Sequence, residues 1–307
     1  MAAIKLEGVL PPVSTPFDEQ GELDAEALRG NLARLGRFGL AGFVVLGSNG
    51  ESVHLSEGEA RRVMETARSA TSEQRVLIAG VGRPSTRETL QWSRYAAAAG
   101  ADATLVLPPS YFRNQMTPEV LVDYFREVAD GSAIPVTLYN MPACTGIDLD
   151  VETVLRLAEH ENIVGIKDSS GNMAKLGELC QCAPQGFAVL VGTAGALVPA
   201  LVLGAAGGIV ALANIAPQEC LDMYWDVRHG DTAAARAVQL RLMRLNRAVT
   251  RGWGVPALKA AMDMLGLFGG PPRRPLPPLP QGEREALRRL LADAGIGPVD
   301  PTGGGGG

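Results

Sequence analysis

Short runs of β-branched and aliphatic residues recur along the chain, and each is followed by a stretch with the periodicity of a helix. Successive runs begin between 19 and 34 residues apart, which is the length of one strand–helix unit. Eight strands are predicted in this way, at 8–17, 42–47, 76–82, 103–109, 135–140, 163–168, 187–192 and 206–212.

The segments between these runs contain helix signals. Residues 24–35 place leucines three or four positions apart, as one face of a helix requires. Thr117 is followed by Pro118, the order expected at a helix N-terminus. Ser56 and Glu59 have the spacing of a capping box.

Eight strand–helix units within about 220 residues predict an α/β fold of the (β/α)8, or TIM, barrel type. A doubly wound open sheet is the alternative, but it places a glycine-rich phosphate-binding turn after its first strand. Here that position reads PPVSTPF, which favours the barrel.

The chain beyond the eighth strand is predicted to stay helical, with helices at 217–227, 232–250, 255–267 and 282–294. The segment GGPPRRPLPPLP at 269–280 is interpreted as a stiff strap between the last two helices, although it also suits a proline-helix ligand. The predicted organisation is a catalytic barrel at 1–216, the last barrel helix with a C-terminal helical appendage at 217–300, and a disordered glycine tail at 301–307.

The composition excludes several classes of protein. Hydrophobic residues make up 46% of the chain and charged residues 20%, the balance of a globular protein. The net charge of −5 argues against a general nucleic-acid binder, which needs a basic surface. The sequence shows no signal-peptide pattern and no apolar stretch long enough for a membrane span. Four cysteines in 307 residues do not make a disulfide framework, so we expect a cytoplasmic protein.

Motifs for several kinds of chemistry are absent from the sequence. It has no GxGxxG, Walker, HExxH or GxSxG pattern, and its three histidines are far apart. Cys180 and Cys182 have the wrong spacing for a zinc knuckle, and we interpret them as helix packing. The sequence therefore predicts no metal ion and no organic cofactor.

Polar side chains gather where the predicted strands end. The active site of a TIM barrel forms at these carboxyl ends. The turn 47–51, Tyr111, Tyr139 and Lys167 lie at the ends of four different predicted strands. We therefore expect one lysine, two tyrosines and a turn of small polar residues to converge on one rim.

Lys167 is the candidate for covalent chemistry. Only four of the 28 basic residues are lysines, and a lysine can lose its proton where an arginine cannot. Lys167 ends the apolar run IVGIK, and burial favours the neutral amine. Such an amine can attack a ketone and form an iminium, which acts as an electron sink. The alternative is a lysine paired with Asp168 or with a carboxylate across the barrel.

Tyr139 is the natural proton carrier beside such a lysine, because its hydroxyl can shuttle protons during iminium formation and carbon–carbon cleavage. The alternative is a packed tyrosine with a satisfied hydroxyl. The turn 47–51 offers successive backbone N–H groups to an anion, and Ser48 adds a hydroxyl.

Four motifs in this order give the chain a family resemblance. GSNGE at 47–51, PPSYF at 108–112, LYNMPACTG at 138–146 and IVGIKDSSGN at 163–172 resemble the pyruvate-dependent class I aldolases. This is the superfamily of dihydrodipicolinate synthase and N-acetylneuraminate lyase, and the match runs from about residue 8 to 268. Within it, GFVVLGSNGE, ALANI and the segment 248–276 look most like the 4-hydroxy-2-oxoglutarate aldolase branch.

The resemblance implies a role for each matching residue. Lys167 would form the Schiff base, Tyr139 would be the general acid/base, and Ser48 would bind substrate and join the proton relay. Tyr111 would reach into the site of a neighbouring subunit in a homotetramer, a dimer of dimers. The remaining substrate-binding residues would be Asn49, Gly50, Ser169, Gly192 and Ile209, the last two lining the iminium pocket.

The implied reaction is the reversible cleavage of 4-hydroxy-2-oxoglutarate to pyruvate and glyoxylate. The synthase branch, which condenses pyruvate with aspartate semialdehyde, has an arginine in the loop after strand 5, and here Cys144 occupies that place. A Cys144 nucleophile is disfavoured because no histidine lies near it in the sequence. The alternatives are 4-hydroxy-tetrahydrodipicolinate synthase, a related 2-oxo acid aldolase or dehydratase, and a non-catalytic pyruvate sensor.

Overall fold

The computed structural model describes residues 4–299, so the predicted glycine tail at 301–307 lies outside the described residues. Eight parallel strands form one sheet in the order β1-β8-β7-β6-β5-β4-β3-β2. They are β1 (Gly8–Leu10), β2 (Gly42–Val45), β3 (Val76–Gly80), β4 (Ala103–Val106), β5 (Val136–Asn140), β6 (Ile163–Asp168), β7 (Ala188–Val191) and β8 (Gly207–Ile209).

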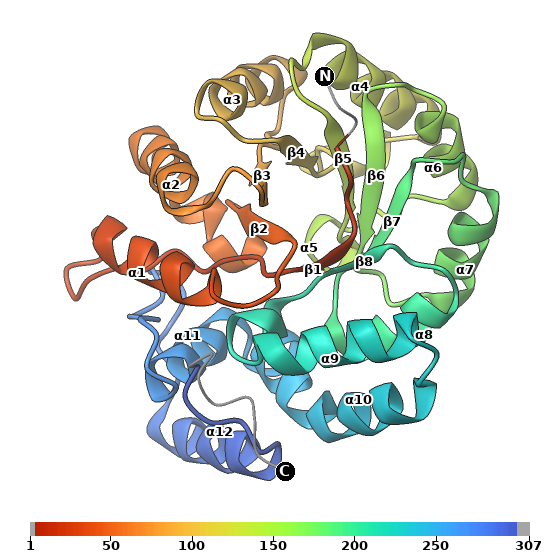
Figure 1. Ribbon diagram of the computed structural model, residues 1–307. Helices are drawn as coiled ribbons and strands as arrows, with labels where there is room; N and C mark the ends of the chain where they lie inside the picture. Colours follow the sequence, from red (N-terminus) through yellow and green to blue (C-terminus); the bar gives the residue numbers. More distant parts are fainter. Residues whose placement is uncertain (1–3, 300–307) are drawn as a thin grey trace.

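Backbone hydrogen bonds join the two ends of this sheet. The N–H of Ala41 donates to the carbonyl of Val9 at 3.0 Å, and the N–H of Val44 donates to the carbonyl of Pro11 at 3.0 Å. The strands thus form a ring that the helices surround (Figure 1). The (β/α)8 barrel prediction is confirmed.

Helices follow the strands in regular alternation around the ring. They are α1 (Ala25–Leu35), α2 (Glu57–Ala70), α3 (Thr86–Ala98), α4 (Pro118–Gly131), α5 (Pro142–Thr145), α6 (Val151–Ala158), α7 (Met173–Cys182), α8 (Leu197–Val202) and α9 (Pro217–Arg228). The predicted caps are present: Ser56 and Glu59 form a reciprocal capping box at α2, and the Thr117 hydroxyl accepts from the N–H of Val120 at α4.

Strand β1 is shorter than the predicted run 8–17, because Pro11 and Pro12 follow it directly. Proline has no N–H to donate to a ladder. Pro12 still makes an isolated parallel bridge with Val44. The chain after Leu10 continues beside β2, where the N–H of Val13 donates to the carbonyl of Val44 at 2.8 Å, and Pro12 lines the cavity described below.

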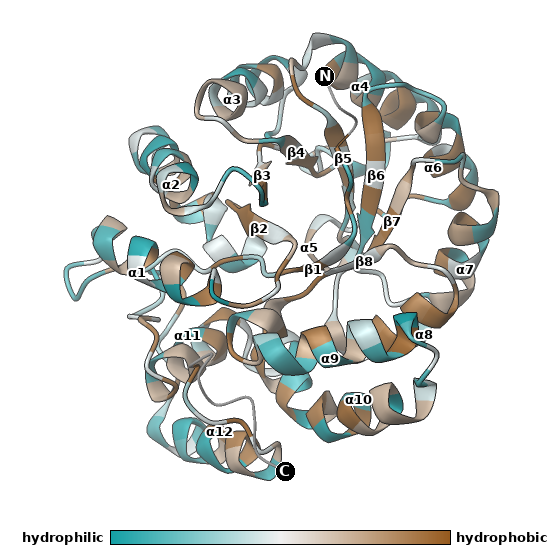
Figure 2. Ribbon diagram, viewed as in Figure 1, coloured by the Kyte–Doolittle hydropathy of each residue, from teal (hydrophilic) through white to brown (hydrophobic). Residues whose placement is uncertain are grey.

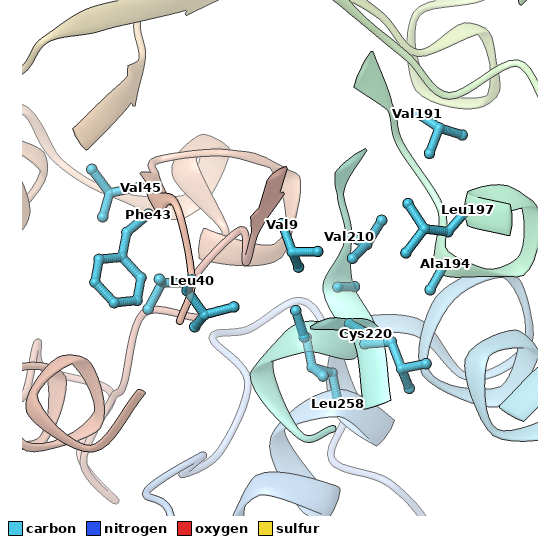
Figure 3. Close-up of a cluster of buried hydrophobic side chains, with 14 of the residues drawn as sticks. Val9, Leu40, Phe43, Val45, Val191, Ala194, Leu197, Val210, Cys220 and Leu258 are labelled. Carbon is cyan, nitrogen blue, oxygen red and sulfur yellow. The ribbon is translucent and has the colours of Figure 1, made fainter. Parts of the chain in front are cut away.

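Two hydrophobic cores hold the barrel. An outer core lies between the strands and the helices, where Val9 and Val210 share a cluster with Cys220 of α9 (Figure 3). A smaller inner core fills the ring itself and includes Tyr139 and Leu190. Hydrophobic residues concentrate in central strands such as β6, whereas the outer helices show many hydrophilic positions (Figure 2).

The C-terminal part adds three helices beyond α9, namely α10 (Thr232–Arg247), α11 (Gly254–Met264) and α12 (Gln281–Asp293). Helix α10 packs against the outside of α9 (Figure 1). Residues 269–280 cross from α11 to α12 as the predicted strap. In residues 4–299, no helix has the length and apolar character needed to cross a membrane.

Candidate active site

A cavity of about 300 Å³ opens at the carboxyl ends of the strands, the face on which TIM-barrel sites are built. Its volume is at the lower end of the range for small-molecule sites. Six of the predicted site residues line it: Ser48, Asn49, Tyr139, Lys167, Ser169 and Gly192. Residues at the ends of β2, β5, β6 and β7 are thus brought together, whereas Tyr111 after β4 is not among them.

Lys167 projects into this cavity from β6 and is only 3% exposed. Tyr139 of β5 and Leu190 of β7 are its register partners, so all three side chains point to the same side of the sheet. The Lys167 Nζ lies 4.1 Å from the centre of the Tyr139 ring. None of the described carboxylates forms an ion pair with Lys167, so its amine faces the cavity without a neutralising partner.

The other three lysines are all paired. Lys5 forms an exposed pair with Glu7. Lys175 contacts both Asp148 and Asp168, and Lys259 contacts Glu51 at 2.8 Å. None of these three side chains lines the cavity. Lys167 is therefore the one lysine of residues 4–299 that both lines the cavity and has no carboxylate partner.

The neighbouring Asp168 carboxylate is turned away from Lys167. One of its oxygens accepts from the backbone N–H of Ser170 at 2.9 Å. The other accepts from the Asn140 amide at 2.8 Å and contacts the Lys175 Nζ at 2.9 Å. This buried network supports the end of β6 from behind, and the alternative in which Asp168 neutralises Lys167 is wrong.

The Ser48 and Tyr139 hydroxyls lie 3.4 Å apart across the cavity floor. Ser48 and Asn49 belong to a single turn of 3₁₀-helix, Ser48–Gly50, that follows β2. The Gly50 carbonyl accepts from the Thr15 hydroxyl at 2.6 Å, which holds this turn against the loop after β1. A hydroxyl relay and a polar turn thus stand beside the Lys167 amine.

Ser169 packs unusually closely against β7. A Cβ placed on Gly192 would lie 1.8 Å from the Ser169 Oγ and 2.8 Å from its Cβ. Only glycine leaves room for this hydroxyl, which belongs to a cavity-lining residue two positions after Lys167.

The geometry of the barrel and its cavity agrees with the comparisons to known proteins. The family model described as "Dihydrodipicolinate synthetase family" matches residues 5–294. The chain belongs to the dihydrodipicolinate synthetase family. As a member of this family it is an enzyme, an aldolase-type carbon–carbon lyase.

Individual family members match over nearly their whole length. A 4-hydroxy-tetrahydrodipicolinate synthase of Methanothrix thermoacetophila is 37% identical over 92% of this chain and 95% of its own. A probable mitochondrial 4-hydroxy-2-oxoglutarate aldolase of Emericella nidulans is 37% identical over 94% of each chain. The crystal structure of an E. coli prophage protein of the family, solved with pyruvate, is 31% identical with a TM-score of 0.89 over 95% of this chain and 100% of its own.

Three of the predicted site residues lie outside the cavity lining of this family member. Gly50 is the buried last residue of the Ser48–Gly50 turn, and Ile209 is buried in the inner core with Tyr139. Tyr111 is 85% exposed and meets Phe112 edge to face, with ring centres 5.0 Å apart. Tyr111 does not reach the cavity of its own subunit.

The cavity of the family member also has a wall that the sequence reasoning missed. Val249, Thr250 and Arg251 line it from the π-helical turn Ala248–Gly252, which connects α10 to α11. These residues lie within the segment 248–276 that contributed to the family resemblance, but nothing in that pattern links residue 251 to the strand ends. Cys144 lines the cavity from α5 and is a free, exposed thiol.

A buried ion pair connects the end of the cavity-lining turn after β2 to the strap at 269–280. Glu51 has a left-handed φ of 51° and is buried, as is Lys259, which also donates to the carbonyl of Pro271 at 2.9 Å. Burial lowers the pKa of the Lys259 ammonium from its ordinary value, and Glu51 opposes that shift. The backbone N–H of Arg273 donates to the second Glu51 oxygen at 2.9 Å.

Replacing Lys259 by methionine should destabilise the protein strongly. The change leaves the Glu51 carboxylate buried without its cation, which costs about 3–5 kcal/mol of unfolding free energy. Lys5→Met removes the same charge from an exposed pair and should change stability by less than about 1 kcal/mol. Urea denaturation of the two variants measures both values, and equal stabilities would contradict the importance of the pair.

Gly192→Ala should damage the site locally. The added methyl group displaces Ser169, and such overpacking costs about 1–3 kcal/mol. We expect an increased KM together with the lower stability. Gly177→Ala in α7 is the matched control, because its methyl group would meet Leu203 at an ordinary 3.5 Å. Thermal unfolding and steady-state kinetics of the two variants test this, and a wild-type KM in Gly192→Ala would show that the Ser169 position is unimportant.

Proposed function

We propose that this protein is a Schiff-base-forming class I aldolase that reversibly cleaves 4-hydroxy-2-oxoglutarate to pyruvate and glyoxylate. The observation that carries the proposal is the buried Lys167 amine, unpaired among the described residues and 4.1 Å from the Tyr139 ring. A neutral amine in this position can form an iminium with a ketone, which then accepts the electron pair of a breaking carbon–carbon bond. No metal or organic cofactor takes part in these steps.

The steps follow from the chemistry of the 2-oxo acid. The Lys167 amine adds to C2, and the resulting carbinolamine loses water to give the iminium. Removal of the proton from the C4 hydroxyl breaks the C3–C4 bond, releases glyoxylate and leaves an enamine. A proton is then added at C3, and hydrolysis of the iminium releases pyruvate and restores the amine.

Tyr139 and Ser48 are proposed to move the protons in this sequence. Their hydroxyls are 3.4 Å apart, close enough to tighten into a direct relay when substrate is bound. The turn that contains Ser48 and Asn49 is proposed to bind the carboxylate next to the reacting ketone, through backbone N–H groups and the Ser48 hydroxyl.

The choice of aldehyde rests on charge. Among the described residues, no aspartate or glutamate lines the cavity, so nothing there would neutralise the ammonium of aspartate semialdehyde. Glyoxylate has no ammonium group. The synthase reaction remains the second candidate, because the Methanothrix relative carries that name at 37% identity.

A panel of substrates distinguishes the two reactions. Pyruvate release from 4-hydroxy-2-oxoglutarate should exceed, by at least about tenfold in kcat/KM, the condensation of pyruvate with aspartate semialdehyde, a difference of about 1.4 kcal/mol in transition-state binding. Faster condensation with the semialdehyde would favour the synthase. Pyruvate binding with neither reaction would favour the sensor.

We further propose a homotetramer in which Tyr111 completes the site of a two-fold related subunit. Its ring is exposed, and the adjacent Phe112 is 65% exposed, so both are available to such a contact. In a two-fold interface each subunit would supply one Tyr111 to the other.

Subunit exchange tests this arrangement. Lys167→Ala and Tyr111→Phe proteins, each inactive, should regain part of the activity when their subunits exchange. No recovery after confirmed exchange, or a monomer in sedimentation, would contradict this arrangement.

A further inference from the structure

Arg251 lines the cavity from a stretch of backbone that is wider than an α-helix. The N–H of Trp253 donates to the carbonyl of Ala248 at 2.9 Å, five residues earlier, and residues Ala248–Gly252 form a π-helical turn. Such wide turns insert one residue into a helix and are frequent at functional sites. Here the turn lets Val249, Thr250 and Arg251, three consecutive residues, line one cavity.

The Arg251 guanidinium reaches across to the loop after β6. A Cβ placed on Gly171 would lie 3.1 Å from the Arg251 Nη2, so the absence of a side chain at Gly171 leaves room for the guanidinium. Gly171 follows Lys167 by four positions. The cation thus stands at the rim of the same site that contains the reactive amine.

The charge of Arg251 is not neutralised within the part of the chain that the structure describes. It is exposed, and no described carboxylate forms an ion pair with it. Lys167 and Arg251 are the charged side chains of the cavity lining, and no described acid accompanies them there. The iminium nitrogen of Lys167 is bonded to C2 of the substrate, so Arg251 is the cation of the lining that is left to contact a second anionic group.

We propose that Arg251 binds the distal carboxylate of the substrate, the one that leaves with the aldehyde, and so selects anionic aldehydes over neutral ones. This inference rests on the proposed function, because it takes the Lys167 end of the cavity as the place of the ketone. A guanidinium offers two parallel N–H donors to a carboxylate, which fixes its orientation. Cys144, which also lines the cavity, supplies no charge of this kind.

Binding of two matched ligands tests the role of Arg251 without cleavage. 2-Oxoglutarate and 2-oxopentanoate have the same five-carbon 2-oxo acid skeleton, but only the first has a distal carboxylate. Arg251→Met should weaken 2-oxoglutarate binding roughly 10- to 100-fold, the usual effect of losing hydrogen bonds to a charged group. Binding of 2-oxopentanoate should stay within about threefold. Arg251→Lys, which keeps the charge but loses the paired donors, should fall between.

Arg247→Met is the matched control. It removes the same charge from the exposed end of α10, one turn earlier and outside the cavity lining, and should leave both dissociation constants unchanged. Calorimetric titration of the wild type and the three variants supplies the measurements. Equal weakening of both ligands by Arg251→Met would overturn the assignment, as would a wild-type protein that does not prefer the dicarboxylate.

Kinetics separate this inference from the proposed function. Arg251→Met should lower kcat/KM for 4-hydroxy-2-oxoglutarate but not for 4-hydroxy-2-oxopentanoate, which would release neutral acetaldehyde. If the wild type cleaves both substrates and Arg251→Met leaves the ratio of their kcat/KM values unchanged, the role of Arg251 is overturned and the proposed function stands. If the protein cleaves neither substrate but still binds the dicarboxylate in preference, and this preference needs Arg251, the role of Arg251 is supported and the proposed function is contradicted.

Discussion

Replacing Lys167 by alanine is expected to abolish turnover, with a loss on the order of 10⁴-fold or more, as when other enzymes lose a covalent nucleophile. The reason is geometric as well as chemical. Lys5, Lys175 and Lys259 lie outside the cavity lining and each is paired with a carboxylate, so no other described lysine supplies an amine to the cavity. The fold should persist, because the change removes a buried amine that has no ion-pair partner among the described residues.

Lys167→Arg is the control for charge. An arginine keeps the positive group on β6 but does not give up its proton, so it cannot form the iminium. Both variants should therefore be inactive in a pyruvate-release assay while their circular dichroism and melting curves remain those of a folded protein. Substantial activity in Lys167→Arg would mean that the site needs a positive charge and not a nucleophile.

Replacing Tyr139 by phenylalanine is expected to lower kcat by roughly 10²–10⁴-fold, the range for a positioned general acid/base. The ring would remain in the inner core and keep its 4.1 Å contact with the Lys167 Nζ, so packing and lysine position should be preserved. Only the hydroxyl, 3.4 Å from that of Ser48, is lost.

Tyr124→Phe is the matched control for this change. Tyr124 is also buried, its hydroxyl lies 3.1 Å from that of Thr89, and neither residue lines the cavity. That variant should lose about 1 kcal/mol of stability and none of its activity. Stopped-flow or steady-state rates of both variants test whether the Tyr139 hydroxyl transfers protons. A nearly wild-type kcat in Tyr139→Phe would show that this hydroxyl has only a structural role.

The sequence predicted the barrel and the floor of the site because both follow from local patterns. Apolar runs mark the strands, and the rule that TIM-barrel sites form at strand ends then brings Lys167, Tyr139 and Ser48 together. The prediction of the first strand followed the apolar pattern alone and extended it to residue 17. Pro11 and Pro12 already indicate an end at Leu10, where β1 ends in the structure.

Features that depend on distant partners could not be predicted in this way. Lys259 and Glu51 are separated by 208 positions, and no sequence pattern indicates that they meet. Arg251 reaches the cavity only because α10 ends in a π-helical turn, a backbone detail that hydrophobic periodicity does not encode. The role proposed for the exposed Tyr111 likewise depends on a second subunit, which strand-end patterns within one chain do not place.

The central claim is that the Lys167 amine forms a covalent iminium with pyruvate, and reductive trapping tests it most directly. The wild-type protein is treated with pyruvate and borohydride, digested, and analysed by mass spectrometry. We expect the mass of one reduced pyruvyl group on the peptide that contains Lys167, and no such addition in Lys167→Ala. Addition to Lys175 or Lys259 instead, or no covalent addition to a protein that still releases pyruvate from its substrate, would contradict the claim.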